Sequence, residues 1–198
     1  MIATKDIHTH ILFGVDDGAR TIEESLALLE HEIKLGYREV YLTPHMISGS
    51  SQTASKEIIY QNFALLKEKA KHLPITLHLG SEIYYVDKLI ERINRGEFIP
   101  LGDSNQYLVE FSTKVKRLDF DEVIYNASLE NITIFIAHPE RYINVKMEEI
   151  ILLKKLGAMI QVNQDSLLGK EGFVVKRRAK KLLKLGIVDA IASDIHHL

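Results

Sequence analysis

The sequence contains no cysteine among its 198 residues, which excludes disulfide bonds and every reaction that needs a thiolate nucleophile. Its formal net charge of -2 provides no basic field for non-specific binding of nucleic acid. No apolar run approaches the length of a membrane span, and the first residues lack the apolar core of a signal peptide. Glycine-rich phosphate loops, the dinucleotide fingerprint and the nucleophile elbow are missing too. We therefore expect a single cytoplasmic domain, residues 1–198, without a nucleic-acid partner or a transmembrane segment.

Short apolar runs alternate with helical patterns along the sequence, which predicts βα units and a largely parallel sheet. Strands are expected over residues 6–13, 39–43, 75–82, 107–111, 132–137, 158–163 and 187–192. Helices are expected over residues 21–36, 56–72, 87–95, 119–130, 147–156 and 173–185. The first helix has clear boundaries, because Thr21 and Glu24 have the spacing of a capping box and Gly36 is a natural stop. Seven such units in 198 residues predict a closed or nearly closed α/β barrel.

Histidines and carboxylates recur where the apolar runs give way to loops. They are His8, His10, Asp16 or Asp17, His45, Glu82, Glu110, His138, Asp194 and His196. Nitrogen and carboxylate ligands of this kind suit a hard-to-borderline metal cluster. Because active sites of such barrels lie at the carboxyl ends of the strands, the pattern predicts a metal-dependent hydrolase.

The spacing within the motifs supports a shared site. His8 and His10 project from the same side of a strand, so both can hold one metal, and Asp194 and His196 repeat this spacing. Glu82 ends an otherwise apolar strand, as Glu110 does, and burying an unpaired carboxylate there is costly unless a cation compensates its charge. Strand alternation places His78 on the same face as Glu82. We do not expect it to bind a metal directly, and at most it contacts the side chains that do.

Each motif taken alone also has a structural interpretation. An H-x-H pair can be two hydrogen-bonded core histidines, and the Asp-Asp-Gly run at 16–18 can be an ordinary turn. The buried glutamates could pair with lysine or arginine. The basic run at 176–181 is typical of a solvated helix face, although it could bind an acidic partner.

Taken in order, these residues resemble the polymerase-and-histidinol-phosphatase (PHP) family. Within it they are most similar to the manganese-dependent bacterial protein-tyrosine phosphatases of the CpsB/CapC/YwqE type. The stretches that carry the resemblance are Asp6–Leu12, Val15–Ala19, Thr43–His45, Gly80–Glu82, Tyr107–Phe111, His138–Tyr142, Gln161–Asn163 and Ser193–His196. The Asp-Asp-Gly loop and the His-Pro-Glu-Arg-Tyr run favour this branch over histidinol phosphatases.

The resemblance implies a distorted seven-stranded, TIM-like barrel with three divalent metal ions, of which manganese is favoured over iron or zinc. Its motif positions imply that His8, His10, Glu82 and Asp194 hold one metal, that Glu82, Glu110 and His138 hold a second, and that Asp17, His45 and His196 hold the third. Arg141 matches the arginine that grips the phosphate. Family members continue past the Asp-x-His motif into a second arginine and final helices, so the resemblance implies a C-terminally truncated chain.

The function implied is hydrolysis of phosphotyrosine in the tyrosine-rich tail of a bacterial tyrosine autokinase that regulates capsule or exopolysaccharide synthesis. His45 and His196 are expected to influence proton transfer as metal ligands, and the general acid stays unassigned. The rival hypotheses are a histidinol-phosphate phosphatase or another small-molecule phosphoesterase, an amidohydrolase, and a metal-binding regulatory module without activity. The amidohydrolase class expects a bridging lysine where this sequence has Glu82 and Glu110.

Overall fold

The computed structural model describes residues 4–47, 49–50, 53–115 and 121–198. The strands of this part are β1 (Lys5–Thr9), β2 (Glu39–Leu42), β3 (His45–Met46), β4 (Thr76–Leu79), β5 (Glu82–Tyr84), β6 (Gln106–Glu110), β7 (Thr133–Ile136), β8 (Met159–Asn163) and β9 (Ala190–Ala192). The helices are α1 (Ile22–Leu35), α2 (Lys56–Lys69), α3 (Leu89–Asn94), α4 (Asp121–Leu129), α5 (Met147–Lys155), α6 (Gln164–Leu168) and α7 (Phe173–Lys184), with a 3₁₀ turn at Pro139–Arg141.

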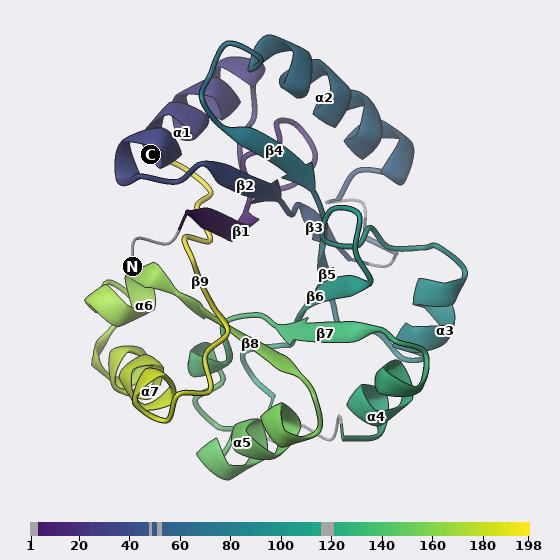
Figure 1. Cartoon of the computed structure of the whole chain (residues 1–198), viewed down its shortest axis with the longest axis vertical. Helices are drawn as coiled ribbons and strands as arrows, with labels where there is room; N and C mark the ends of the chain where they lie inside the picture. The colour runs from purple at the N-terminus through teal and green to yellow at the C-terminus, as the bar shows by residue number, and fades with distance from the viewer. Residues whose placement is uncertain (1–3, 48, 51–52, 116–120) are drawn as a thin grey trace.

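Every pair of neighbouring strands is parallel, as the alternation of strands and helices predicts. One sheet has the order β1-β2-β4 and the other the order β3-β5-β6-β7-β8-β9. The two sheets curve around a common centre, and the helices lie on the outside (Figure 1). The chain beyond β9 lies beside β1, where the His10 amide donates to the Ile195 carbonyl at 2.9 Å and Thr9 forms a parallel bridge with Ile195.

The described residues contain nine strands where the sequence predicts seven, because the expected strand 75–82 is interrupted and an unexpected short strand, β3, follows the expected strand 39–43. Between β2 and β3 lies Pro44, which has no amide hydrogen to give to a ladder. The expected strand 75–82 breaks at Gly80, where an added Cβ would lie only 2.8 Å from a Leu101 methyl carbon. The strands after Pro44 and Gly80, β3 and β5, belong to the larger sheet, and there His45 pairs with Glu82.

This interruption corrects the expectation for His78. Its ring stacks on Tyr41 with centroids 4.5 Å apart, and its Nε2 lies 3.4 Å from a Glu39 oxygen. His78 and Glu82 belong to different strands, β4 and β5, so alternation along one strand does not place them on the same face. His78 lies away from the side chains that gather at the strand ends.

The helix boundaries follow the predicted signals closely. Thr21 Oγ1 accepts a hydrogen bond from the Glu24 amide, and Gly36 closes α1 in the left-handed conformation with φ 101°. The expected helix 119–130 is described from Asp121 onward, so its first residues lie outside the described part, as do residues 48, 51 and 52 of the expected loop. Helix α6 and the 3₁₀ turn were not expected, since both are too short to show a period.

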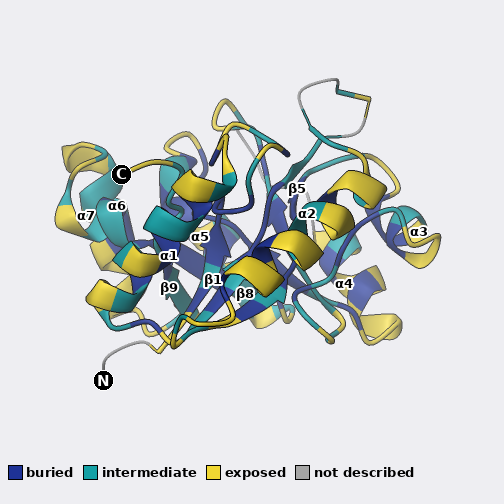
Figure 2. Cartoon of the chain, turned by 90° about the horizontal axis from the view of Figure 1, so that it is seen from above, coloured by how far each residue is buried: buried dark blue, intermediate teal, exposed yellow. Residues whose placement is uncertain are grey.

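Buried hydrophobic side chains fill the space between the sheets and the outer helices. One cluster lies between β5–β8 and helices α3, α4, α5 and α7, and a second lies between β1, β2 and β4 and helices α1 and α2. The strands are buried, whereas the outer faces of the helices are exposed (Figure 2). No helix within the described ranges is long and apolar enough to cross a membrane. This core holds the carboxyl ends of the strands in fixed positions.

Candidate metal centre

The predicted ligands converge from six strand ends. His8 lies in β1, His45 in β3, Glu82 in β5 and Glu110 in β6, and His138 follows β7. The remaining members are His10, Asp17, Asp194 and His196, which lie on the loops after β1 and β9. Strand register explains part of this convergence, because His45 pairs with Glu82, and Tyr84 of the same strand pairs with Glu110.

Glu82 lies at the centre of the cluster and is only 1% exposed. Its Oε2 lies 3.2 Å from His8 Nε2 and 3.3 Å from His10 Nε2. The same oxygen lies 3.0 Å from His45 Nδ1, and Oε1 lies 3.0 Å from His138 Nε2. One carboxylate thus contacts four imidazoles, which is the arrangement expected for a group shared between cations.

The structure separates the roles of the two adjacent aspartates. Asp16 accepts from the His45 backbone amide at 2.9 Å, and its Oδ2 lies 2.8 Å from His10 Nδ1. It therefore fixes the orientation of His10, as the partners behind metal ligands do. Asp17 instead lies 3.5 Å from His45 Nε2 and 3.6 Å from His196 Nε2.

The loop that carries these aspartates requires glycine at position 18. An added Cβ on Gly18 would lie 2.0 Å from the His10 carbonyl oxygen. The loop must pass this close because the Ala19 amide donates to that same carbonyl at 3.1 Å. The close approach therefore couples the aspartate loop to the backbone of His10.

Two residues at the site have backbone conformations that non-glycine residues rarely adopt. His138 has φ 31° and Asp194 has φ 56°, so both lie in the left-handed region. Such conformations cost about 1–3 kcal/mol each and persist where surrounding contacts enforce them. The Asp194 amide donates to the His8 carbonyl at 2.9 Å, which supplies one such contact. Asp194 and His196 therefore reach the site through a turn, and the predicted strand alternation does not apply to them.

Two side-chain amides on β8 form hydrogen bonds to the candidate ligands. The sequence analysis assigned them no role. Gln161 Oε1 lies 3.1 Å from His8 Nδ1 and accepts from the His138 amide at 3.1 Å. Asn163 donates to Asp194 Oδ2 at 2.8 Å and accepts from Gln161 at 2.7 Å. Polar side chains at alternate positions of an otherwise apolar strand were the signal that could have identified them.

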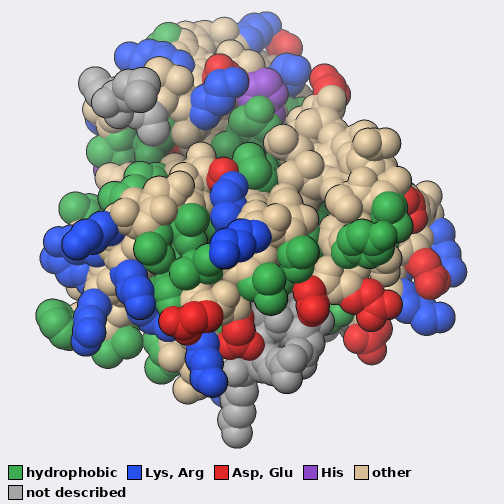
Figure 3. Space-filling view, turned by 60° about the horizontal axis from the view of Figure 1, so that its bottom comes forward, with side chains coloured by type: hydrophobic (Ala, Val, Ile, Leu, Met, Phe, Trp, Pro, Cys, Tyr) green, Lys and Arg blue, Asp and Glu red, His purple; other side chains and the backbone are tan. Residues whose placement is uncertain are grey.

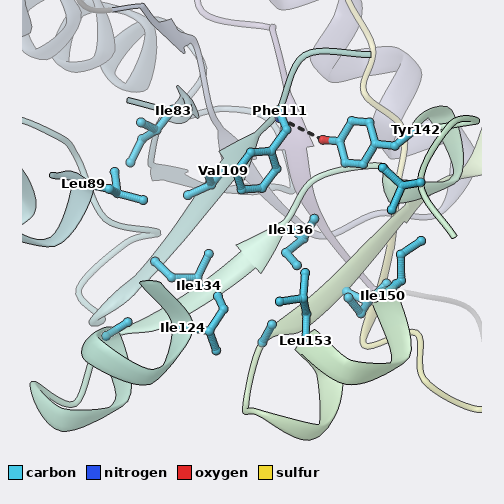
Figure 4. Close-up of a cluster of buried hydrophobic side chains, with 14 of the residues drawn as sticks. Ile83, Leu89, Val109, Phe111, Ile124, Ile134, Ile136, Tyr142, Ile150 and Leu153 are labelled. Atoms are coloured by element: carbon cyan, nitrogen blue, oxygen red, sulfur yellow. Dashed lines mark hydrogen bonds between the residues drawn. The ribbon is translucent and has the colours of Figure 1, made fainter. Parts of the chain in front are cut away.

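The loop after β7 is anchored by a buried tyrosine. The Tyr142 hydroxyl accepts from the Phe111 amide at 2.9 Å and donates to the Ala137 carbonyl at 2.8 Å (Figure 4). Tyr142 is fully buried in the cluster beneath β6 and β7. This anchor holds both His138 and Arg141, which lie on the same short turn.

Arg141 contacts the cluster of candidate ligands through Asp194, and Glu171 is its second carboxylate partner. Its Nε and Nη2 donate to the two oxygens of Glu171 at 2.8 and 3.1 Å. Its Nη1 donates to Asp194 Oδ2 at 2.9 Å. Burial alone would lower the pKa of Arg141, but Glu171 and Asp194 raise it, so the guanidinium is held as a cation. Sequence reasoning missed Glu171 because no motif surrounds it.

Mutual electrostatic interactions hold charges of both signs in this buried cluster. Burial disfavours the charged form of His8, yet Glu82 and Asp194 raise its pKa to about 9. Burial likewise acts against the carboxylate of Glu82, but the neighbouring imidazoles, His8 first, hold its pKa well below its usual range. Burial and the nearby Glu82 raise the pKa of Glu110. The same side chains attract protons and metal ions, so binding of a metal would compete with protonation of these histidines.

Within the described residues, four overlapping groups have ligand atoms that all lie within 4.8 Å of one another. These groups are His10-Asp17-His45-His196, His8-His10-Glu82, His8-His138-Asp194 and His45-Glu82-Glu110. All nine predicted ligands belong to these groups, and no other side chain does. This grouping of the side chains differs from the one that the family resemblance implies. In the structure His45, and not His138, is grouped with Glu82 and Glu110. His138 Nε2 nonetheless lies 3.9 Å from a Glu110 oxygen.

Comparison with known proteins gives a consistent result. The family model for capsular polysaccharide synthesis proteins of the CpsB/CapC type matches residues 4–198. The tyrosine-protein phosphatase CpsB of Streptococcus agalactiae serotype V is 33% identical over 204 residues, which cover 98% of this chain and 83% of that protein. The tyrosine-protein phosphatase YwqE of Bacillus subtilis is 28% identical over 199 residues, which cover 98% of this chain and 77% of that protein.

Solved structures agree with the sequence comparison. A chain from the crystal structures of Bacillus subtilis YwqE and Streptococcus pneumoniae CpsB, described as unique metal-dependent tyrosine phosphatases, matches with a TM-score of 0.85 and 26% identity. The match covers 98% of this chain and 80% of that chain. The histidinol phosphate phosphatase of Lactococcus lactis shares the fold, with a TM-score of 0.64, 14% identity and coverage of 98% and 86%. The chain described here belongs to the CpsB/CapC family of capsular polysaccharide synthesis proteins.

Proposed function

We propose that this chain is a metal-dependent protein-tyrosine phosphatase that hydrolyses phosphotyrosine in the tail of a bacterial tyrosine autokinase. The observation that carries the proposal is the cluster of nine histidine and carboxylate side chains beside the guanidinium of Arg141. Membership of the CpsB/CapC family supports it, because relatives across 98% of the chain are tyrosine-protein phosphatases.

The donor set fits three divalent ions, with manganese favoured. Imidazole nitrogens and carboxylate oxygens are ligands that manganese, iron and zinc all accept. His138 Nε2 lies 3.0 Å from Glu82 Oε1 and 3.9 Å from a Glu110 oxygen, so these three donors are close enough together to share a cation. His8, His10, Glu82 and Asp194 would hold one ion, Glu82, Glu110 and His138 a second, and Asp17, His45 and His196 the third. When bound, such ions supply polarisation of a phosphoryl oxygen and a lower pKa for a bound water.

Arg141 binds the phosphate of the substrate. Three of its five N–H groups meet Glu171 and Asp194, so two stay available for phosphoryl oxygens. Charge-assisted hydrogen bonds of this kind are strong and directional. His45 and His196 shape proton transfer only through the ion they hold, since a ligating imidazole is a poor free acid.

We also infer that the two sheets make up one distorted seven-unit barrel. In this interpretation β2 with β3, and β4 with β5, each count as one interrupted strand. The parallel bridge between Thr9 and Ile195 supports the closure, because it joins the segment after β9 to the end of β1.

The test is turnover by the purified protein with added manganese. We expect hydrolysis of a phosphotyrosine peptide, slow or no hydrolysis of histidinol phosphate, and no hydrolysis of a dihydroorotate-type amide. A preference for histidinol phosphate over the peptide would overturn the assignment of the substrate. Loss of turnover after chelation, with recovery on adding manganese, is expected for the proposed metal centre.

A further inference from the structure

A groove lies between the start of α5 and α7, on the side of the 3₁₀ turn that carries Arg141. It has a volume of about 370 Å³ and is lined by Ile143, Lys146, Met147, Glu148, Phe173, Val174, Arg177, Arg178 and Lys181. Basic and hydrophobic side chains lie next to one another on the face formed by this part of the molecule (Figure 3). The groove takes no part in the proposed metal centre.

The hydrophobic lining of the groove is unusually exposed. The exposed fractions are 78% for Phe173, 57% for Val174 and 53% for Ile143. Single exposed apolar residues are normal, but a contiguous set rimmed by polar groups is typical of an interaction site. The three side chains come from two separate segments, so the tertiary fold and not a local run of sequence brings them together.

The charged lining favours an anion. Four basic side chains face a single acidic one, Glu148. Arg178 donates through Nε to the Glu140 carbonyl at 3.1 Å, while its buried Nη2 has no hydrogen-bond partner within the described ranges. The Glu140 carbonyl thus holds the guanidinium of Arg178 at the groove, where Lys146, Arg177 and Lys181 add further positive charge. Burial also lowers the pKa of Arg178, so a nearby anion would stabilise its charged form.

The groove adjoins the residue that binds the phosphate. The Ile143 amide donates to the Arg141 carbonyl at 2.9 Å, and Phe173 follows Glu171, the partner of Arg141, after one glycine. An extended peptide advances about 3.3 Å per residue, so residues close to a bound phosphotyrosine reach the groove.

We propose that this groove binds the polypeptide on one side of the substrate phosphotyrosine, and that it selects an apolar residue accompanied by aspartate or glutamate. The proposal rests on the proposed function. The apolar residue packs against Phe173 and Ile143, and the carboxylates meet Arg177, Arg178 and Lys181. The groove thereby makes the enzyme specific for phosphotyrosine in a protein context over small phosphomonoesters.

The test compares charge reversals at two pairs of basic residues on α7, of which only one pair lines the groove. The groove variant is Arg177→Glu with Lys181→Glu, and the control is Lys180→Glu with Lys184→Glu, which makes the same charge change on exposed residues that do not line the groove. Each protein is assayed with manganese on p-nitrophenyl phosphate, on a phosphotyrosine peptide with acidic and apolar flanks, and on the same peptide with neutral polar flanks.

In the groove variant, we expect the ratio of kcat/KM for the acidic peptide to that for p-nitrophenyl phosphate to fall by roughly three- to tenfold, through KM. The same ratio should change less than about twofold in the control variant and with the neutral peptide. An equal fall of this ratio in both variants would overturn the proposal, because it would indicate a general electrostatic effect of the charge change and not binding in the groove. If the wild type hydrolyses neither p-nitrophenyl phosphate nor the peptides, the proposed function fails. In that case, fluorescence anisotropy of the labelled acidic peptide tests the groove separately, and equal affinities for the groove and control variants would overturn it.

Discussion

The ion pair between Arg141 and Glu171 gives a quantitative prediction about catalysis. Glu171→Ala removes two charge-assisted hydrogen bonds of 2.8 and 3.1 Å that orient the guanidinium. The side chains are 31% and 20% exposed, so water screens the pair in part and its contribution is about 1–2 kcal/mol. If the pair serves only to aim Arg141 at phosphate, kcat/KM should fall roughly 5- to 30-fold, chiefly through KM.

A double-mutant cycle with Arg141→Ala isolates this effect. Arg141→Ala alone should lower kcat/KM by roughly one to two orders of magnitude, with melting temperature and metal content nearly unchanged. In that background Glu171→Ala should have little further effect, which gives a coupling energy of about 1–2 kcal/mol. Asp165→Ala is a suitable control, since it removes a neighbouring carboxylate whose ion-pair partner is the exposed Lys170. Inhibition by inorganic phosphate should weaken in parallel with KM.

Two results would refute the reasoning. If Glu171→Ala raises kcat/KM, then Glu171 competes with the substrate phosphate for Arg141 and does not position it. If the two substitutions are additive, Glu171 acts on something other than Arg141. A large drop in melting temperature for Arg141→Ala would instead mark the arginine as a structural ion-pair partner of Glu171 and Asp194.

Three further predictions concern the cluster and its support. Glu82→Gln should abolish turnover and lower metal content, because Glu82 contacts four imidazoles; unchanged metal content by elemental analysis would contradict this. Burial and Asp6 raise the pKa of Glu32 from 4.5 to about 8, so the folded protein loses stability as pH rises through that range. Glu32→Gln should therefore raise the melting temperature at pH 8.5 much more than at pH 5, and a pH-independent difference would refute it. Gly18→Ala should destabilise the protein by about 1–3 kcal/mol in urea unfolding, because its Cβ would meet the His10 carbonyl.

The convergence of the nine candidate ligands could be predicted because the signal of each is local. Each lies where an apolar strand ends, and parallel strands bring such ends to one face. His8 and His10 illustrate this, with their Nε2 atoms 3.3 Å apart as the alternate spacing predicts. Residue spacing alone left the choice between Asp16 and Asp17 open, because it depends on the path of a loop, and only the family resemblance pointed to Asp17.

Other parts of the site depend on long-range contacts that leave weak traces in the sequence. Glu171 lies 30 residues from Arg141 on a short loop, and nothing in the neighbouring sequence distinguishes it from a glutamate without a partner. The two strand interruptions had visible signals in Pro44 and Gly80. Their consequence, a second sheet that starts again at His45 and Glu82, required the packing of Gly80 against Leu101.

Elemental analysis of the purified protein, combined with anomalous scattering at the manganese edge, tests the central claim most directly. We expect manganese bound by the nine side chains that converge at the strand ends, with Glu82 contacting more than one ion. Turnover of a phosphotyrosine peptide should rise and fall with this metal content. A protein purified and assayed in excess manganese that contains no metal at these residues, or that hydrolyses the peptide equally well after complete chelation, would contradict the account.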